Sequence, residues 1–173
     1  MIFHFQIISQ EIKDFRLEVE LSSRHTFFDF HSIIQKSLGY ESHQLASFFI
    51  PNLRGLKEKE ISMLDLGMNG GAYLIMQKTI LSDLIHSKLQ KLIYTFDFVN
   101  DRSLLIELTD IIMEKNLSEP LVTLKLGDTP QQVLGEDVDV IDQEALDIQE
   151  EKSYSLFGEL EDYTEIFGEM DDF

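Results

Sequence analysis

TFFDFHSIIQKSLGYESHQLASFFI, residues 26 to 50, predicts a capped helix that is followed by a short apolar run. Thr26 and Asp29 have the spacing of a capping box. The threonine hydroxyl satisfies a free amide of the first turn, and the carboxylate sits where the helix dipole favours negative charge. Gly39 supplies a left-handed stop. One face of this helix is apolar, because four apolar side chains recur at the helical period: Phe27, Phe30, Ile34 and Leu38. We therefore expect the domain to be built on this helix.

Strand patterns flank the helix on both sides. Residues 2–8 (IFHFQII) and 15–21 (FRLEVEL) predict an antiparallel hairpin, because only a short linker joins them. Residues 48–50 predict a third strand, which Pro51 ends. Strict alternation in the second strand places one set of side chains on the buried face, namely Phe15, Leu17, Val19 and Leu21, and another in water, namely Arg16, Glu18 and Glu20.

The sequence pattern in the second half of the chain predicts mainly strands. Residues 52–71 combine LKEKE with a glycine-rich piece but lack the GK[ST] ending of a P-loop and the GxGxxG spacing of a dinucleotide turn, which favours a surface loop over a phosphate site. Residues 73–76 predict a short strand, and ILSDLI predicts a helical turn with its serine as N-cap. The remaining strands are expected at residues 91–98, 103–112 and 121–126, the first two joined as a hairpin by the Asn100-Asp101 turn.

This order of elements predicts an α+β fold with a β-grasp-like ββαβ core and an additional β-hairpin. We expect the folded domain to span residues 1–132 and a largely disordered acidic tail to span residues 133–173. The chain has 173 residues, 43% of them apolar, which suffices for one domain with a core. No apolar run is long enough for a membrane span, and the start lacks the pattern of a signal peptide, so we expect a soluble cytoplasmic protein.

The formal charge of -18 is concentrated at the C-terminal end. Residues 136–173 hold fifteen acidic side chains and a single basic one, Lys152, which gives this segment a charge of -14, whereas residues 1–135 carry -4. With only four arginines, the chain has little with which to neutralise phosphates. Direct binding to nucleic acid is therefore disfavoured, unless Arg16, Arg24, Lys36 and Arg102 gather in one patch of the folded domain.

The acidic segment contains a repeated pattern. LFGELEDY at residues 156–163 returns ten positions later as IFGEMDDF at residues 166–173. Acidic composition alone indicates a solvated, disordered tail, whereas the repeat indicates two docking motifs for a basic protein partner, with aromatic anchors and steering carboxylates. Folding back on its own domain and mimicry of nucleic-acid charge are further alternatives. The docking hypothesis assigns partner binding to Leu156, Phe157, Glu159, Tyr163, Ile166, Phe167, Glu169 and Phe173.

The helix and the residues after it resemble the plasmid pRiA-type ORF-three-like family, whose members are sometimes labelled transposon passenger proteins or TnpR. The shared motif places Thr26, Phe27, Asp29, Phe30, His31, Ile34, Gln35, Gly39, Tyr40, His43, Leu45 and Phe48 at matching positions. The resemblance continues through LSDL at residues 81–84, YxFDF at 94–98 and GDTPQQ at 127–132, and the acidic tail is similar to that of a Bacteroidetes-type subgroup. It implies little about activity beyond an association with mobile elements.

The chain departs from the family where the typical YDFGDxWxH becomes FDFVNDRSL, which puts Val99, Arg102 and Leu104 at the glycine, tryptophan and histidine positions. A site built on that segment is expected to be lost. Among the motif residues, Thr26, Phe27, Asp29, His31, Gly39, Tyr40 and His43 are expected to be mainly structural.

No constellation of catalytic or metal-binding residues emerges from the sequence. His25 and His31 are six residues apart, which is not the spacing that puts two imidazoles on one helical face, and the chain has no cysteine. We expect no metal and no cofactor, and a buried, hydrogen-bonded role for His31. The sequence favours a non-enzymatic adaptor that binds a basic partner through its tail. The alternatives are a plasmid- or transposon-associated factor acting on nucleic acid through the folded domain, and an enzyme in which His31, His43 and a carboxylate converge.

Overall fold

The structure is a computed structural model that describes residues 1–65, 67 and 74–135. The chain separates into a unit of Met1–Val133 and a unit of Leu134–Phe173, and the elements below belong to the first. Its strands, in chain order, are β1 (Ile2–Ser9), β2 (Arg16–Ser22), β3 (Ser47–Pro51), β4 (Lys57–Ser62), β5 (Leu74–Ile75), β6 (Lys91–Asp97), β7 (Arg102–Ile112) and β8 (Leu121–Leu126). Its helices are α1 (Phe27–Leu38) and the single turn α2 (Leu81–Leu84).

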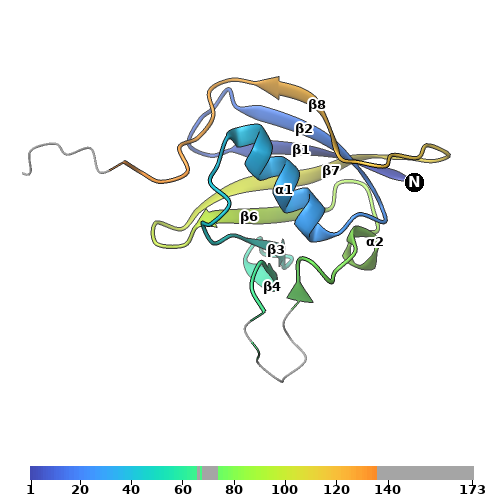
Figure 1. The fold of residues 1–173 in the computed structure, drawn as a ribbon, viewed down its shortest axis with the longest axis horizontal. Coiled ribbons are helices and arrows are strands. Elements are labelled where there is room, and N and C mark those ends of the chain that lie inside the picture. Colours follow the sequence, from blue (N-terminus) through green and yellow to red (C-terminus); the bar gives the residue numbers. More distant parts are fainter. Residues whose placement is uncertain (66, 68–73, 136–173) are drawn as a thin grey trace, which may run out of the picture. The chain divides into compact units, whose positions relative to one another are not determined.

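All eight strands form one mixed sheet in the order β5-β4-β3-β6-β7-β1-β2-β8 (Figure 1). Neighbouring strands are antiparallel except β4 and β5, which are parallel. The predicted hairpins β1–β2 and β6–β7 are both confirmed. The described part of the fold is therefore mostly sheet with few helices, which is α+β-like. None of the helices in the described ranges is long and apolar enough to cross a membrane.

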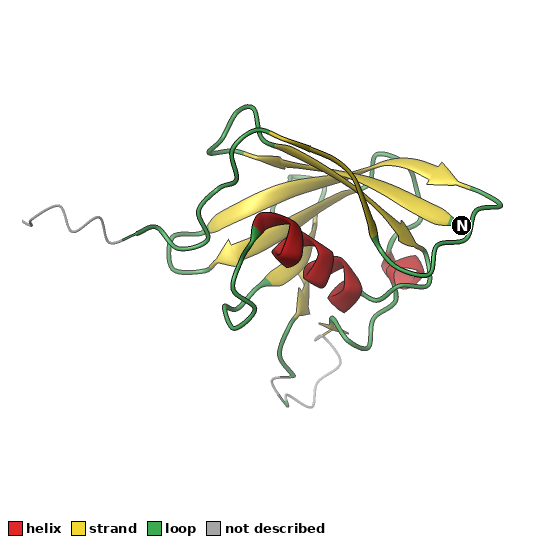
Figure 2. Cartoon of the chain, turned by 45° about the horizontal axis from the view of Figure 1, so that its top comes forward, coloured by secondary structure: helices red, strands yellow, loops and turns green. Residues whose placement is uncertain are grey.

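Helix α1 crosses one face of the sheet, as both views show (Figure 2). Its apolar side supplies Phe30, whose ring stacks on Phe5 of β1 at 4.6 Å and on Phe48 of β3 at 5.1 Å between centroids. Such aromatic pairs stabilise a core beyond the area that they bury. The fully enclosed aromatic side chains come from α1, from three strands and from the residue before β2: Phe3, Phe5, Phe15, Phe27, Phe30, Phe48 and Tyr94.

Both predicted ends of α1 are confirmed. The Thr26 hydroxyl accepts a hydrogen bond from the Asp29 amide at 3.1 Å, and an Asp29 carboxylate oxygen accepts one from the Thr26 amide at 2.8 Å. Gly39 ends the helix with φ of +67°, in the left-handed region that a residue without Cβ adopts freely. Local sequence chemistry therefore sets the limits of α1.

Replacing Thr26 by alanine is expected to lower the free energy of unfolding by about 1 kcal/mol, because the Asp29 amide loses its acceptor. Urea unfolding followed by circular dichroism measures the change. Thr26→Ser, which keeps the hydroxyl, is the matched control and is expected to retain most of the stability. Equal losses in the two variants would contradict a capping role for the hydroxyl.

Three local predictions are wrong. Residues 57–62 form the strand β4 rather than a surface loop; only Ile61 of β4 is a buried apolar side chain, so the segment lacks the alternation that predicts a strand. The N-cap of α2 is Ile80, whose amide donates to Asp83, and not the serine. Glu20 is buried instead of solvated, because β8 pairs with its strand and Lys115 binds its carboxylate at 2.8 Å.

Candidate functional site

A buried polar chain links α1 to the central sheet. His31 and Gln35 lie one turn apart on the helix and both contact the hydroxyl of Tyr94 on β6, His31 through Nδ1 at 2.9 Å and Gln35 through Nε2 at 2.6 Å. All three side chains are at least 95% buried. The other amide atom of Gln35, Oε1, is buried and has no hydrogen-bond partner among the described residues. Buried polar atoms are normally paired, so this atom marks an incomplete network.

Burial also fixes the charge states of this chain. Desolvation lowers the pKa of His31 from 6.5 to about 4, so its imidazole is neutral at pH 7. Desolvation raises the pKa of Tyr94 above its usual value, so the phenol stays protonated. The network is therefore uncharged under physiological conditions, and the expected buried, hydrogen-bonded place of His31 agrees with the structure.

A pocket of about 270 Å³ opens beside the polar chain. Its apolar walls are Phe28 and Met63, and the ring of Phe28 lies 5.8 Å from that of His31 between centroids. Lys36 is exposed at its rim. The complete lining is Phe28, His31, Ser32, Gln35, Lys36, Tyr40, Ser42 and Met63. The pocket therefore combines the buried polar chain with apolar walls and an exposed cation.

The other histidines do not join this pocket. His43 is exposed and contacts Glu41 at 3.1 Å. His25 accepts a hydrogen bond from the Ser22 amide at 3.1 Å and contacts the Ser118 carbonyl oxygen, also at 3.1 Å. Across the described ranges, no three histidine, aspartate or glutamate side chains come close enough to hold a metal ion. The convergence of His31 and His43 that an enzyme hypothesis requires is not found.

Arg102, at the position where the family pattern has tryptophan, is buried and lies at the centre of a second polar cluster. Its guanidinium binds both carboxylate oxygens of Glu11 at 2.6 and 2.7 Å and lies 3.5 Å from Asp97. It also lies over the ring of Phe96, 4.9 Å from the centroid. The hydrogen bonds that Arg102 donates to Glu11 raise its pKa and burial lowers it, and the net effect raises it. The arginine is therefore permanently charged and fully partnered.

The same arginine holds the end of the described chain. Its guanidinium donates to the carbonyl oxygens of Gln131 at 2.6 Å and Gln132 at 3.3 Å. The Tyr40 hydroxyl donates to the carbonyl of Pro130 at 2.6 Å. The Gln132 side chain pairs with the backbone of Glu41, accepting from its amide at 2.6 Å and donating to its carbonyl at 2.9 Å. We call residues 130–132 the C-terminal anchor.

Gly127, the first residue of the GDTPQQ motif, helps to position the C-terminal anchor. Gly127 has φ of +75° and packs against the backbone before β2, where a Cβ would lie 2.4 Å from the carbonyl oxygen of Asp14. Only glycine fits both the torsion angle and the space. The motif therefore turns the chain out of β8 and leads it to the anchor.

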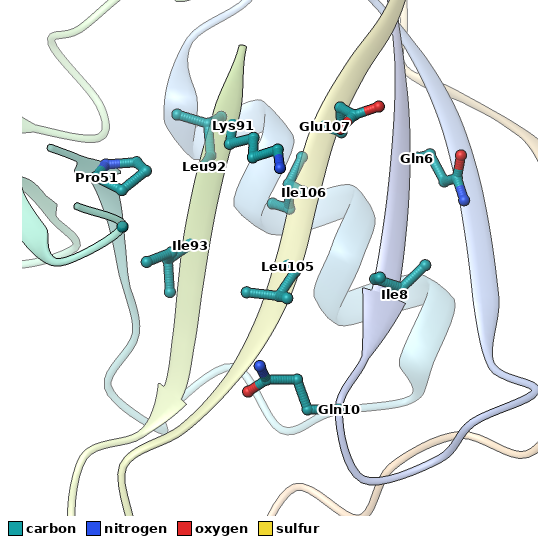
Figure 3. A pocket seen from close by; sticks show the side chains of 11 residues that line it. Gln6, Ile8, Gln10, Pro51, Lys91, Leu92, Ile93, Leu105, Ile106 and Glu107 are labelled. Atoms are coloured by element: carbon teal, nitrogen blue, oxygen red, sulfur yellow. The ribbon is translucent and has the colours of Figure 1, made fainter. Parts of the chain in front are cut away.

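The sheet face opposite α1 carries a shallow apolar groove of about 380 Å³ (Figure 3). Ile8, Leu105 and Ile93 are neighbours across β1, β7 and β6 and form its floor. Polar side chains surround this floor, namely Gln6, Gln10, Lys91 and Glu107. Neither helix of the described chain covers this face (Figures 1 and 2).

The basic side chains considered for nucleic-acid contact are dispersed. Arg16 begins β2 and Arg24 follows its other end, whereas Lys36 lies in the last turn of α1. Arg102 is buried and ion-paired with Glu11. They do not form one patch, so the nucleic-acid hypothesis gains no support from their positions and stays a prediction.

The predicted partner-binding residues, from Leu156 to Phe173, lie outside the described residues. Of the motif residues, Thr26, Asp29 and Gly39 cap α1, Phe27 is in the core, and Tyr40 holds the C-terminal anchor. Two partnerships in the structure were not predicted from the sequence: that of Tyr94 with His31 and Gln35, and that of Glu11 with Arg102. The alternation of residues along β6 could have indicated Tyr94 as a partner, because this alternation places its phenol in the core.

These features define an α+β domain with one capped helix on one face of a broad, mostly antiparallel sheet. The same fold occurs in the crystal structure of MM3350 from Methanosarcina mazei Go1, a protein of unknown function, with a TM-score of 0.56 and 21% identity over 72% of this chain and 68% of that one. The profile of the plasmid pRiA4b ORF-3-like protein family matches residues 6–161, so the chain belongs to that family.

The family match confirms the resemblance found in the helix motif and extends beyond residue 132, to which the resemblance was traced, into the acidic segment. None of the curated proteins compared with the chain matches it.

Proposed function

We propose that the protein is a non-enzymatic adaptor whose acidic C-terminal segment binds a basic protein partner. The observation that carries this proposal is the repeat of LFGELEDY as IFGEMDDF within a segment of charge -14. Aromatic and aliphatic anchors supply affinity at an interface, and surrounding carboxylates raise the rate of encounter with a basic surface. Two motifs on one segment raise each other's effective concentration at a partner with two sites.

The C-terminal anchor supports this proposal from the side of the folded domain. Arg102 and Tyr40 hold residues 130–132 against the domain, only four positions before the acidic segment begins at residue 136. The backbone that leads into the segment is therefore held by the domain at a fixed point. The domain then acts as a carrier for the motifs.

Deleting residues 155–173 is expected to abolish capture of the basic partner from lysate of the native host while leaving thermal unfolding of the domain unchanged. Quantitative mass spectrometry of the captured proteins measures the loss. Capture is also expected to weaken as salt rises, because exposed charges are screened beyond about 10 Å at 0.1 M ionic strength. Retained capture after the deletion would refute the docking role of the segment.

Point variants distinguish the contribution of the aromatic anchors to partner binding from that of the acidic charge. Phe157→Ala and Phe167→Ala each remove one aromatic anchor, and the double variant is expected to lose far more binding than either single variant if the motifs act together. Glu159→Gln with Glu169→Gln is the matched control for charge and is expected to slow association while keeping the anchors. If the phenylalanine variants bind as well as the natural chain, the segment is a solvating tail.

For the fold, we propose that the core is β-grasp-like. The first four elements, β1, β2, α1 and β3, follow the ββαβ order, and α1 packs across the face that β1 and β3 share. The additional hairpin β6–β7 lies between β3 and β1 in the sheet. In this interpretation the hairpin is an insertion that widens the sheet.

A further inference from the structure

We propose that a hollow beside the turn between β6 and β7 takes an apolar side chain of the basic protein partner. The hollow has a volume of about 350 Å³. Its lining includes Leu45 from the loop before β3, Phe98 and Val99 from the turn, and Val133, which follows the C-terminal anchor. We call it the hairpin hollow. This inference rests on the proposed adaptor function and adds a surface of the folded domain to the same interface.

The four apolar side chains of the hairpin hollow are unusually exposed. Leu45 is 50%, Phe98 47%, Val99 93% and Val133 58% exposed. Single apolar residues are common on protein surfaces, but these four line one depression. Apolar surface that is gathered in one place and bordered by polar groups marks an interaction site. The hollow therefore offers a place where an apolar side chain of a partner leaves water.

The turn that carries Phe98 and Val99 is fixed by the carboxylate of Asp97. Its oxygen Oδ1 accepts hydrogen bonds from the backbone amides of Val99 and Asn100, each at 3.1 Å. The other oxygen, Oδ2, accepts one from the side-chain amide of Asn100 at 2.9 Å. A surface that is ordered before binding loses less conformational entropy when a partner binds. The two exposed side chains of the turn are therefore held ready for contact.

Two exposed carboxylates flank the hairpin hollow and favour a basic partner. Glu41 is 70% exposed at its side chain, and its backbone binds the side chain of Gln132, a residue of the lining. Asp101 is 81% exposed and lies in the turn itself. Glu41 contacts His43, and Asp101 contacts Lys57, but ion pairs with so exposed a carboxylate are weak. Both carboxylates can therefore attract a positively charged surface to the hollow.

The charge of the whole chain also decides between a second copy and a basic partner. A formal charge of -18 opposes self-association, because molecules of like charge repel each other. Val133, in the lining, lies three positions before residue 136, where the segment of charge -14 begins. A basic partner that binds this segment is tethered to the domain, which raises its effective concentration at the hollow. Charge therefore favours the same partner at both places.

Solvent access to the hairpin hollow is measured first, on the full chain. Nuclear magnetic resonance follows the methyl groups of Val99 and Val133 while a soluble gadolinium chelate is added. Both signals are expected to broaden at every protein concentration. Protection that increases with protein concentration would place a second copy in the hollow, and protection at all concentrations would place a segment of the same chain there. Either kind of protection would overturn the proposal.

The probes are two synthetic basic peptides, KKKGLGKKK and its matched control KKKGSGKKK, which differ in one side chain. Each is titrated into the full chain. The leucine peptide is expected to bind about tenfold more tightly, because it buries its apolar side chain in addition to the charge attraction that both peptides share. It is also expected to shift the methyl signals of Val99 and Val133 saturably. Equal affinities, or shifts that spare these two residues, would overturn the proposal.

Variants of the protein give the reciprocal comparison. Val99→Ser removes an exposed apolar side chain, and it is expected to reduce the preference for the leucine peptide to about twofold without changing the affinity for the serine peptide. Leu53→Ser, at an exposed position in the turn between β3 and β4, is the control and is expected to keep the full preference. An unchanged preference in Val99→Ser would overturn the proposal.

Deletion of residues 155–173 distinguishes this inference from the adaptor function. The deletion is expected to weaken binding of both peptides equally, because it removes charge that both of them use. If it leaves both affinities unchanged while Val99→Ser still removes the leucine preference, the role of the acidic segment fails and that of the hairpin hollow stands. If it weakens both affinities while the natural chain shows no leucine preference, only the hairpin hollow fails.

Discussion

Replacing Arg102 by methionine is expected to lower the free energy of unfolding by about 2 to 3 kcal/mol. The change leaves the carboxylates of Glu11 and Asp97 and the carbonyl of Gln131 without their buried donor. Breaking a buried ion pair by removing one partner costs about 3 to 5 kcal/mol. The expected loss is smaller because the Glu11 side chain is 38% exposed and can turn towards water. Urea unfolding of the full chain measures it.

A matched control compares the stability lost with the Arg102 ion pair to the stability lost with an exposed ion pair. Lys78→Met removes a pair with Asp65 in which both side chains are more than half exposed, and its effect is expected to stay within about 0.5 kcal/mol. Arg102→Lys keeps the charge but loses the planar fork that binds both oxygens of Glu11, so most of the loss is expected to remain. Equal effects of Arg102→Met and Lys78→Met would contradict the structural role of Arg102.

Hydrogen exchange adds a local readout at the anchor. The Glu41 amide donates to the side chain of Gln132, which Arg102 holds in place through the carbonyl of the same residue. In Arg102→Met this amide is expected to exchange faster than amides in β1, because the anchor loosens while the sheet stays folded. Unchanged protection of the Glu41 amide would show that the anchor does not depend on Arg102.

Acidification from pH 6.5 to pH 4 is expected to remove about 3 kcal/mol of stability through His31 alone. The unfolded chain binds a proton at this histidine near pH 6.5, whereas burial lowers the pKa in the folded protein to about 4. Between these values the unfolded state binds more protons, so the free energy of unfolding falls by about 1.4 kcal/mol for each unit of pH. The slope fades within about one pH unit above 6.5 and below 4, where both states carry the same number of protons at this residue.

The measurement is a set of urea unfolding curves at several pH values for the natural chain and for His31→Asn, which retains a polar group near the position of Nδ1 but does not titrate. Subtracting the two profiles removes the common contribution of carboxylates such as Asp97, whose pKa is lowered mainly by its hydrogen bond from Asn100. His43→Asn is the control at an exposed position and is expected to preserve the steep profile. If His31 titrates near pH 6.5 in the folded protein, the prediction is wrong.

The helix was predictable because its signals are local. Thr26 and Asp29 lie within one turn of each other, and Gly39 directly follows the last helical residue. The apolar residues between these ends repeat at the helical period. The strand alternation of residues 15–21 was informative for the same reason. By contrast, β4 carries its single buried apolar side chain, Ile61, next to charged residues, and it is held by pairing with β3 and β5. No pattern within that segment contains this information.

The candidate sites depend on contacts that the order of residues does not reveal. Tyr94 lies 63 positions from His31, and Glu11 lies 91 positions from Arg102. Sequence reasoning placed His31 in a buried environment but had no means to choose its partner among five tyrosines. It also treated Arg102 as a lost family position, although the guanidinium has become the centre of a cluster. The type of His31 indicated that it is buried, whereas the partners of His31 and Arg102 can be identified only in the fold.

The place of β1 in the sheet has a consequence for how the chain folds. This strand is synthesised before both of its neighbours and pairs early with β2, but its other neighbour is β7, so that His4 meets Thr109 across a separation of 105 residues. Closing so long a loop costs conformational entropy before the pairing is formed, and sheets dominated by distant contacts fold slowly. Until residue 112 has been synthesised, the edge of β1 that pairs with β7 has no native neighbour.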